Sequence, residues 1–167
     1  VPEAAWGPLD RELQSLYDLR DDSNFRTGDF GRFEWEWNGE TYSWSKHVEF
    51  LKFIDLPRRS KEAFELALAW EDENDEEVIP QLTSYGWKVV DGISLSLDIG
   101  PYREYILGSR GEFTVAKDQN IRLRSGWFSD RSACYLAAGK PVMTQDTAFG
   151  NILPTGRGLF AFQSMQD

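Results

Sequence analysis

The feature that most constrains the fold of this chain is a regular change in the spacing of its hydrophobic residues. Segments in which every second residue is apolar alternate with segments in which apolar residues recur every three or four positions. The first spacing is typical of β-strands and the second of amphipathic helices. We expect strands over 32–37, 64–70, 87–90, 112–116 and 141–145, and helices over 10–19, 46–54, 78–85, 102–107 and 129–138. Strands that alternate with helices predict an α/β domain with a doubly wound, mostly parallel sheet.

The segment 64–70 has conflicting signals. Its Glu, Leu and Ala residues favour a helix, whereas Phe64, Leu66 and Leu68 follow the spacing of a strand. We predict a buried strand, because the alternation of elements requires one here. The acidic run that follows, 71–77 (EDENDEE), is interpreted as a solvated loop that leads into the next helix, since nothing in the sequence indicates that its carboxylates converge on a metal.

Turn and cap residues bound several of these elements. Asn38 and Gly39 form a turn signal after strand 32–37. Ser45 is positioned to cap the helix over 46–54, and Leu56 with Pro57 is expected to end it. Gly139 is expected to adopt the left-handed conformation that ends helix 129–138.

The length of 167 residues fits one globular unit. We interpret 1–31 as a linker with a packing helix and 32–167 as the working domain. No stretch approaches the roughly 20 apolar residues that cross a bilayer, and no signal peptide is recognisable at the start. The single cysteine, Cys134, cannot form an internal disulfide, and its apolar neighbours indicate a buried side chain. These features predict a soluble protein of the reducing cytoplasm.

The formal net charge of −10 argues against nucleic acids and anionic membrane surfaces as partners, because both bind clustered positive charge. It does not exclude a small phosphorylated ligand. A few local cations and backbone N–H groups are sufficient to bind a diphosphate.

Three groups of polar residues follow the predicted strands or begin the predicted helices. Lys117 follows strand 112–116, residues 126–131 begin the next helix, and Gln145, Asp146 and Thr147 end the next strand or follow it. In a parallel sheet, the carboxyl ends of the strands and the starts of the helices lie at one edge, where ligands bind. We therefore expect these groups to face a common crevice.

The helix start itself has the components of an anion site. Gly126 allows close approach of a ligand to the backbone, Ser129 can cap the helix, and the first N–H groups carry partial positive charge. Lys117, Arg124 and Arg131 could supply cations. The same pattern also fits an ordinary capped helix that binds nothing.

Residues 125–147 (SGWFSDRSACYLAAGKPVMTQDT) and 153–162 (LPTGRGLFAF) resemble the C-terminal half of GT-B fold glycosyltransferases. In that superfamily, a helix ending in Ala-x-Gly-x-Pro-Val leads to a strand, a ligand-contacting turn and a Gly-Leu-Leu strand. Residues 44–57 (WSKHVEFLKFIDLP) and 112–117 (EFTVAK) also resemble a bacterial glycosyltransferase-like subgroup, of the family 1 and family 4 kind.

The resemblance implies a Rossmann-like domain that binds a UDP-, GDP- or TDP-linked sugar without a metal or other cofactor, together with a preceding N-terminal domain. Sugar transfer to an acceptor hydroxyl would need that partner domain. By position, the resemblance assigns the donor diphosphate to Gly126, Trp127, Phe128 and Ser129, and the donor sugar or phosphate to Gln145, Asp146 and Thr147.

The chain departs from the family pattern at informative positions. Many retaining members carry a pair of glutamates where this chain has Gly126 and Cys134, and inverting plant-type members carry Asn where it has Phe128. A non-catalytic binding or interaction module with the same fold is therefore the alternative to a transferase. A different Rossmann-like enzyme is disfavoured, because G-x-G-x-x-G after the first strand and a P-loop are both lacking.

Three aromatic or titratable residues have structural interpretations. His47 is the single histidine, and we interpret it as a capped or surface residue rather than a general base. Trp35 and Trp37 alternate along a strand and are interpreted as core residues rather than sugar platforms. For Asp146, a ligand to sugar hydroxyls and a cap of the following turn both remain open.

Overall fold

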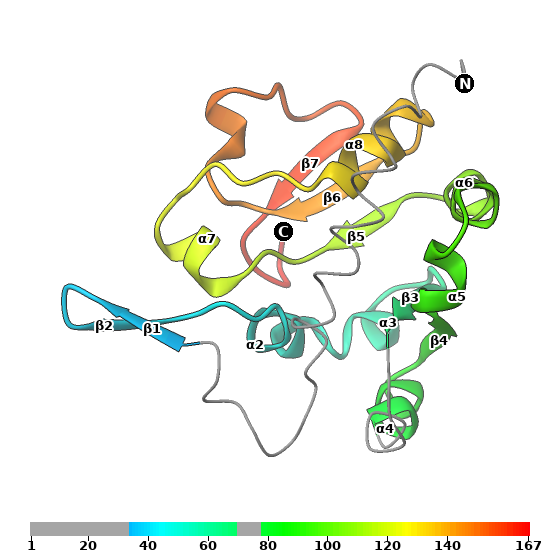
Figure 1. The fold of residues 1–167 in the computed structure, drawn as a ribbon, viewed down its shortest axis with the longest axis horizontal. Helices are drawn as coiled ribbons and strands as arrows, with labels where there is room; N and C mark the ends of the chain where they lie inside the picture. Colours follow the sequence, from blue (N-terminus) through cyan, green and yellow to red (C-terminus); the bar gives the residue numbers. More distant parts are fainter. Residues whose placement is uncertain (1–33, 70–77) are drawn as a thin grey trace.

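The computed structural model describes residues 34–69 and 78–167. The predicted linker over 1–31 with its helix, the first two residues of strand 32–37, Trp70 and the acidic run 71–77 lie outside the described residues. Within them, helices mix with small, largely parallel sheets, so the fold is of the α/β kind (Figure 1).

Seven strands belong to the described part of the chain: β1 (Glu34–Trp37), β2 (Glu40–Ser43), β3 (Phe64–Leu68), β4 (Trp87–Asp91), β5 (Glu112–Thr114), β6 (Val142–Gln145) and β7 (Leu159–Phe162). Its α-helices are α2 (His47–Phe50), α3 (Leu56–Arg59), α4 (Val78–Ser84), α5 (Gly92–Ser96), α6 (Ile99–Gly108), α7 (Asp118–Arg122) and α8 (Asp130–Ala137). Two 3-10 helices, η2 (Leu51–Phe53) and η4 (Phe149–Asn151), complete these elements.

The described strands form three separate sheets. β3 pairs in parallel with β4, and β5, β6 and β7 form a parallel sheet in that order. The segment with conflicting signals is therefore a strand, as the alternation of elements predicted. The parallel pairing agrees with the expected α/β class, while the sheets contain only two or three strands each.

The first predicted strand belongs to an antiparallel hairpin, β1 with β2, and not to a parallel sheet. The reason lies in its turn: Asn38 and Gly39 both have positive φ, of 51° and 76°, which is the geometry of a two-residue hairpin turn. The hairpin extends from one end of the molecule (Figure 1). Its Trp37 is 57% exposed, so the prediction that this residue belongs to the core was wrong.

The helix predicted over 46–54 is broken into two short pieces, α2 and η2, and Pro57 does not end it. Pro57 lies in the first turn of a further helix, α3, where its missing N–H costs no hydrogen bond. The N-cap of α2 is Lys46 rather than Ser45. The expected helix over 129–138 agrees closely with α8, whose N-cap position is Ser129, and Gly139 has a φ of 72°.

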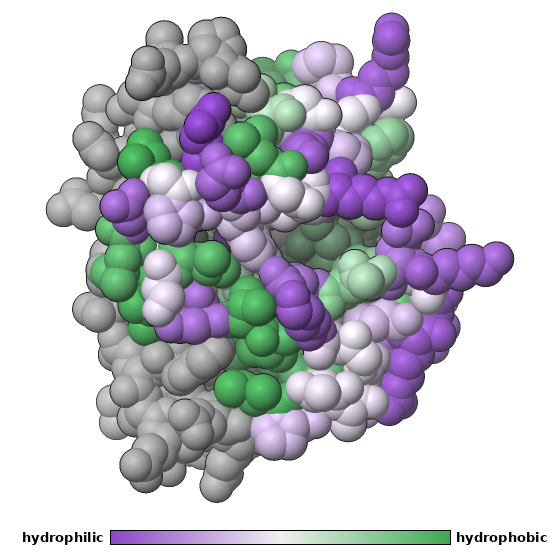
Figure 2. Space-filling model, turned by 90° about the vertical axis from the view of Figure 1, so that its right-hand side faces the viewer, coloured by the Kyte–Doolittle hydropathy of each residue, from purple (hydrophilic) through white to green (hydrophobic). Residues whose placement is uncertain are grey.

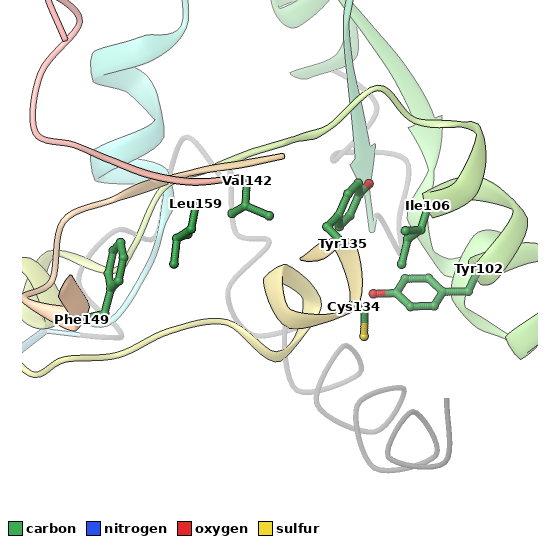
Figure 3. Packing of buried hydrophobic residues seen from close by; sticks show 7 residues of the cluster. All are labelled: Tyr102, Ile106, Cys134, Tyr135, Val142, Phe149 and Leu159. Atoms are coloured by element: carbon green, nitrogen blue, oxygen red, sulfur yellow. The ribbon is translucent and has the colours of Figure 1, made fainter. Parts of the chain in front are cut away.

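Two hydrophobic clusters position these elements. In the first, Tyr102 and Ile106 of α6 pack near Cys134 and Tyr135 of α8, and the cluster continues to β6, β7 and η4 (Figure 3). The second lies between α2, η2, α4, the β3–β4 sheet and the residue after β5. Both clusters include residues on or next to the β5–β6–β7 sheet. Packed hydrophobic side chains therefore support the carboxyl edge of this sheet.

Candidate functional site

The loops at the carboxyl edge of the β5–β6–β7 sheet are hydrogen-bonded to each other. The Gly126 N–H donates to the Thr147 carbonyl at 2.8 Å, and the Thr147 hydroxyl donates to the Trp127 carbonyl at 2.6 Å. Arg124 forms an ion pair with Asp146 at 2.8 Å. The structure thus brings together residues 124–127 and 146–147, which the sequence placed at one sheet edge.

The start of α8 is built from a turn and an aromatic pair. Arg124 and Gly126 both have positive φ, of 51° and 75°, so the chain turns sharply before the helix. The ring of Phe128 packs on Phe149, with centroids 5.5 Å apart, and this contact joins the helix start to the core. Ser129 is at the N-cap, and its side chain makes no capping hydrogen bond. The exposed Asp130 lies in the first turn.

Asp146 has the turn-capping role, one of the two that the sequence left open. Its carboxylate accepts hydrogen bonds from the Ala148 N–H at 2.7 Å, from Arg124 and from the Gln163 amide at 3.1 Å. Burial alone would raise the pKa of Asp146, but these hydrogen bonds lower it below its ordinary value. The carboxylate therefore remains ionised at neutral pH and fixes the turn after β6.

Gln145 is buried and joins α2 to the sheet. Its side-chain oxygen accepts from the Ala116 N–H at 3.2 Å, and its nitrogen donates to Glu49 at 2.8 Å. Glu49 is also bonded to Lys52 at 2.5 Å. With 3% of its surface exposed, Gln145 positions α2 beside the sheet edge rather than presenting its amide to solvent.

Two lysines at this edge lie over indole rings. The ammonium of Lys117 is 4.2 Å from the ring centroid of Trp44, and that of Lys46 is 5.0 Å from the ring centroid of Trp127. Sequence reasoning did not select Lys46 or Trp44 as site residues, although both lie in the segment 44–57 that resembles the family. They reach the edge because Gln145 and Glu49 bring α2 to it, a contact between residues 96 positions apart.

Arg131 points away from the sheet edge. Its guanidinium donates to Glu112 at 2.7 Å and to the Thr114 hydroxyl at 2.9 Å, both on β5. Burial alone would lower the pKa of Arg131, but attraction to Glu112 outweighs it and raises the pKa. Arg131 was expected to supply a cation to a diphosphate, and in this structure its charge already has a partner.

A further hollow adjoins this edge, and Lys46 contributes to its lining. A cavity of about 900 Å³ opens beside β3, α5 and α6, and of the predicted site residues only Arg131 lines it. Among the described residues no group of three or more His, Cys, Asp or Glu side chains could hold a metal ion. No helix in the part of the chain that the structure describes is both long and apolar enough to cross a lipid bilayer.

No match to this chain is found among protein-family models, curated proteins or solved structures. The resemblance to GT-B glycosyltransferases thus rests on the motifs of the sequence.

His47 is buried rather than exposed at the surface, with 7% of its area accessible and its Nδ1 atom 2.6 Å from the Ser45 hydroxyl. Burial lowers the pKa of His47 below its ordinary value of 6.5. Below pH 6.5 the unfolded chain therefore binds more protons than the folded chain. We expect the free energy of unfolding to decrease as the pH falls from 7.5 to 5.5, by at most about 1.4 kcal/mol, because pH 5.5 lies one unit below the pKa of the unfolded chain.

Urea unfolding at several pH values in this range measures that loss. The matched variant, His47→Gln, carries no titrating ring and should lose less stability over the same pH range. An equal loss in the variant and the natural chain would contradict the assignment to His47.

Proposed function

We propose that the chain is the donor-binding half of a GT-B glycosyltransferase, with a doubly wound Rossmann-like fold. It would bind a nucleotide-diphosphate sugar at the carboxyl edge of the β5–β6–β7 sheet, without a metal. Transfer to an acceptor hydroxyl would need a preceding N-terminal domain, in the cytoplasm. The motifs over 125–147 and 153–162 support this assignment, as does the parallel arrangement of β5, β6 and β7 around α8.

The observation that carries the proposal is the hydrogen-bonded junction before α8. Gly126 and Trp127 are joined to Thr147, and Arg124 is joined to Asp146, so two loops meet where a helix starts. The first N–H groups of a helix carry partial positive charge and point toward an approaching anion. A diphosphate in front of α8 would accept hydrogen bonds from these groups.

Side chains around the junction suit the remaining parts of a nucleotide sugar. Lys46, Lys117 and Arg124 are cations at this edge, and each could move from its present partner to a phosphate. The indole rings of Trp44 and Trp127 offer flat surfaces for a base or a sugar. Charge that develops on the leaving diphosphate would be stabilised by the same N–H groups and cations. Arg131 would act indirectly, because its bond to Glu112 joins α8 to β5.

Calorimetric titration of the full chain with UDP, GDP and TDP tests the proposal. We expect one nucleotide to bind below millimolar concentration, and Arg124→Ala to weaken it at least about 10-fold, since a charge-assisted hydrogen bond contributes roughly 1.5–3 kcal/mol. Arg157→Ala is the matched control, because Arg157 is exposed and precedes β7 at the opposite edge of the sheet. The proposal is wrong if none of the three nucleotides binds, or if both variants bind as the natural chain does.

A variant that should tighten nucleotide binding tests whether the phosphates lie at the start of α8. Asp130 is exposed in the first turn, where its negative charge competes with a bound anion for the helix start. Asp130→Asn should therefore bind the nucleotide a few times more tightly. Unchanged or weaker binding would place the phosphates away from the start of α8.

A second candidate is a binding module without transferase activity. One of the two positions where retaining family members carry glutamate is Cys134. This residue is on α8 and is buried in the first hydrophobic cluster, away from the carboxyl edge of the sheet (Figure 3). This module would bind a nucleotide sugar and leave it intact. Incubation with the donor sugar of the nucleotide that binds, followed by chromatography for free nucleotide, separates the two candidates.

A further inference from the structure

The cavity of about 900 Å³ is walled by strands and helices together. Residues of β3, β5, α5, α6 and α8 line it. Figure 2 views the side of the molecule on which α5, α6 and β3 lie and shows apolar side chains recessed between charged ones. A compact hollow between several elements is a common form of small-molecule site. The groups on its walls therefore indicate what kind of molecule it accepts.

Much of the wall is apolar, and part of it is made of aromatic rings. Phe64, Leu66 and Phe113 line the cavity and keep some of their surface accessible, and Met143 is 44% exposed. The rings of Phe64 and Phe113 lie edge to face, with centroids 6.2 Å apart. Transfer of accessible apolar surface from water to an apolar ligand is favourable. The body of the ligand should therefore be apolar, and a flat ring suits a wall of aromatic side chains.

The charged side chains of the wall are largely paired with each other. Three ion pairs have both of their partners on the cavity lining: Glu62 with Arg110, Glu65 with Lys88, and Glu112 with Arg131. The charges of these pairs cancel within the wall. A charged ligand would have to break one pair or lie beside a charge of its own sign, and both are unfavourable away from bulk water. The pairs therefore favour an uncharged ligand.

One polar group on the wall retains unused hydrogen-bond donors. The Nε atom of Arg131 donates to Glu112 and its Nη2 atom donates to Thr114, whereas Nη1 makes no hydrogen bond within the described residues. The side chain of Arg131 is 27% accessible, against 5% for that of Glu112, and it lines the cavity. A guanidinium carries five N–H donors and no acceptor. Nη1 therefore offers N–H groups to an oxygen atom of a ligand in the cavity.

We propose that this cavity binds an uncharged aromatic ligand that bears a carbonyl group. The carbonyl oxygen accepts a hydrogen bond from Nη1 of Arg131, and the ring lies against Phe64 and Phe113. A carbonyl brings no donor of its own, which an apolar wall would leave unpaired. The ion pair with Glu112 stays in place and holds the guanidinium in its orientation. Neither Nη1 nor the two rings takes part in the proposed nucleotide site, so the two sites are independent.

Amide NMR spectra of the isotope-labelled full chain test the proposal with three probes of similar shape. Acetophenone has the ring and the carbonyl, isopropenylbenzene has a methylene group in place of the oxygen, and benzoate has a negatively charged oxygen in place of the methyl group. We expect acetophenone to shift the signals of residues 64–67 and 111–114, with a Kd of about 1 mM or below. At equal concentration, the other two probes should occupy the cavity at least about 5-fold less. Isopropenylbenzene lacks the acceptor, and benzoate brings a second negative charge beside Glu112.

Two variants separate recognition of the carbonyl from occupation of the cavity. Arg131→Lys keeps a cation beside Glu112 but lacks Nη1, so acetophenone and isopropenylbenzene should bind this variant equally. Ala67→Phe, at an exposed position of β3 on the cavity lining, should fill the hollow and abolish the shifts. Ala133→Phe, at an exposed position of α8 away from that lining, is the matched control and should leave them unchanged.

The proposal is overturned if acetophenone shifts none of these signals, or if isopropenylbenzene shifts them equally in the natural chain. Equal or tighter binding of benzoate would overturn it too, because the cavity would then accept an anion. A third contrary result is equal binding of acetophenone to Ala67→Phe and Ala133→Phe, since the ligand would then lie outside the cavity.

Discussion

Replacing Arg131 with methionine is expected to lower the free energy of unfolding by about 3 kcal/mol, because it leaves a buried carboxylate without its cation. Glu112 is 5% exposed, its Oε1 atom accepts from Arg131 at 2.7 Å, and its Oε2 atom has no partner among the described residues. Arg131 also bonds Thr114, so the substitution removes two of the bonds between α8 and β5. Urea unfolding at neutral pH measures the loss.

Two further variants show whether the loss comes from the unpaired charge. The double variant Glu112→Gln with Arg131→Met should recover much of the stability, since it removes the carboxylate charge together with its partner. Arg124→Ala breaks an ion pair whose arginine is 53% exposed, and it should cost less than about 1 kcal/mol. Equal losses for Arg131→Met and Arg124→Ala would contradict the structural role of Arg131.

Phe149→Ala is expected to cost about 3–5 kcal/mol of unfolding free energy, the range for removal of a buried aromatic side chain. Phe149 is 2% exposed and begins η4, between β6 and β7. It packs on Phe128 and belongs to the cluster that joins α6, α8 and the sheet. The cavity left behind would remove the support under the residues that begin α8. If the proposed nucleotide site is correct, nucleotide binding should weaken in the same variant.

The matched control is Phe160→Ala on the neighbouring strand β7. Phe160 is 43% exposed, so its removal should cost about 1 kcal/mol. Thermal or urea unfolding of the two variants gives the comparison directly. A loss for Phe149→Ala no larger than that for Phe160→Ala would show that the first cluster does not support the helix start.

The difference between expectation and structure is clearest at Arg131 and Gln145. The sequence placed both at the sheet edge, beside the start of a helix and at the end of a strand, and the elements α8 and β6 formed where it placed them. The side chains point elsewhere. Arg131 reaches back to β5, and Gln145 reaches Glu49 on α2. A long side chain bonds to whichever partner the fold brings within reach, and the positions of residues along the sequence do not give that distance.

The sequence by itself determined where α8 begins and where the hairpin turn forms. The signals are the spacing of apolar residues, Ser129 at the helix start, and Asn38 with Gly39 in the turn, and each acts between near neighbours. The junction of residues 124–127 with 146–147 followed from the same local assignments, combined with the rule that parallel strands end at one edge. Only the tertiary structure decided that Glu112 pairs with Arg131 and that Gln145 reaches Glu49. Those outcomes depend on how whole elements pack, and packing is set by the volumes and charges of residues far apart in the chain.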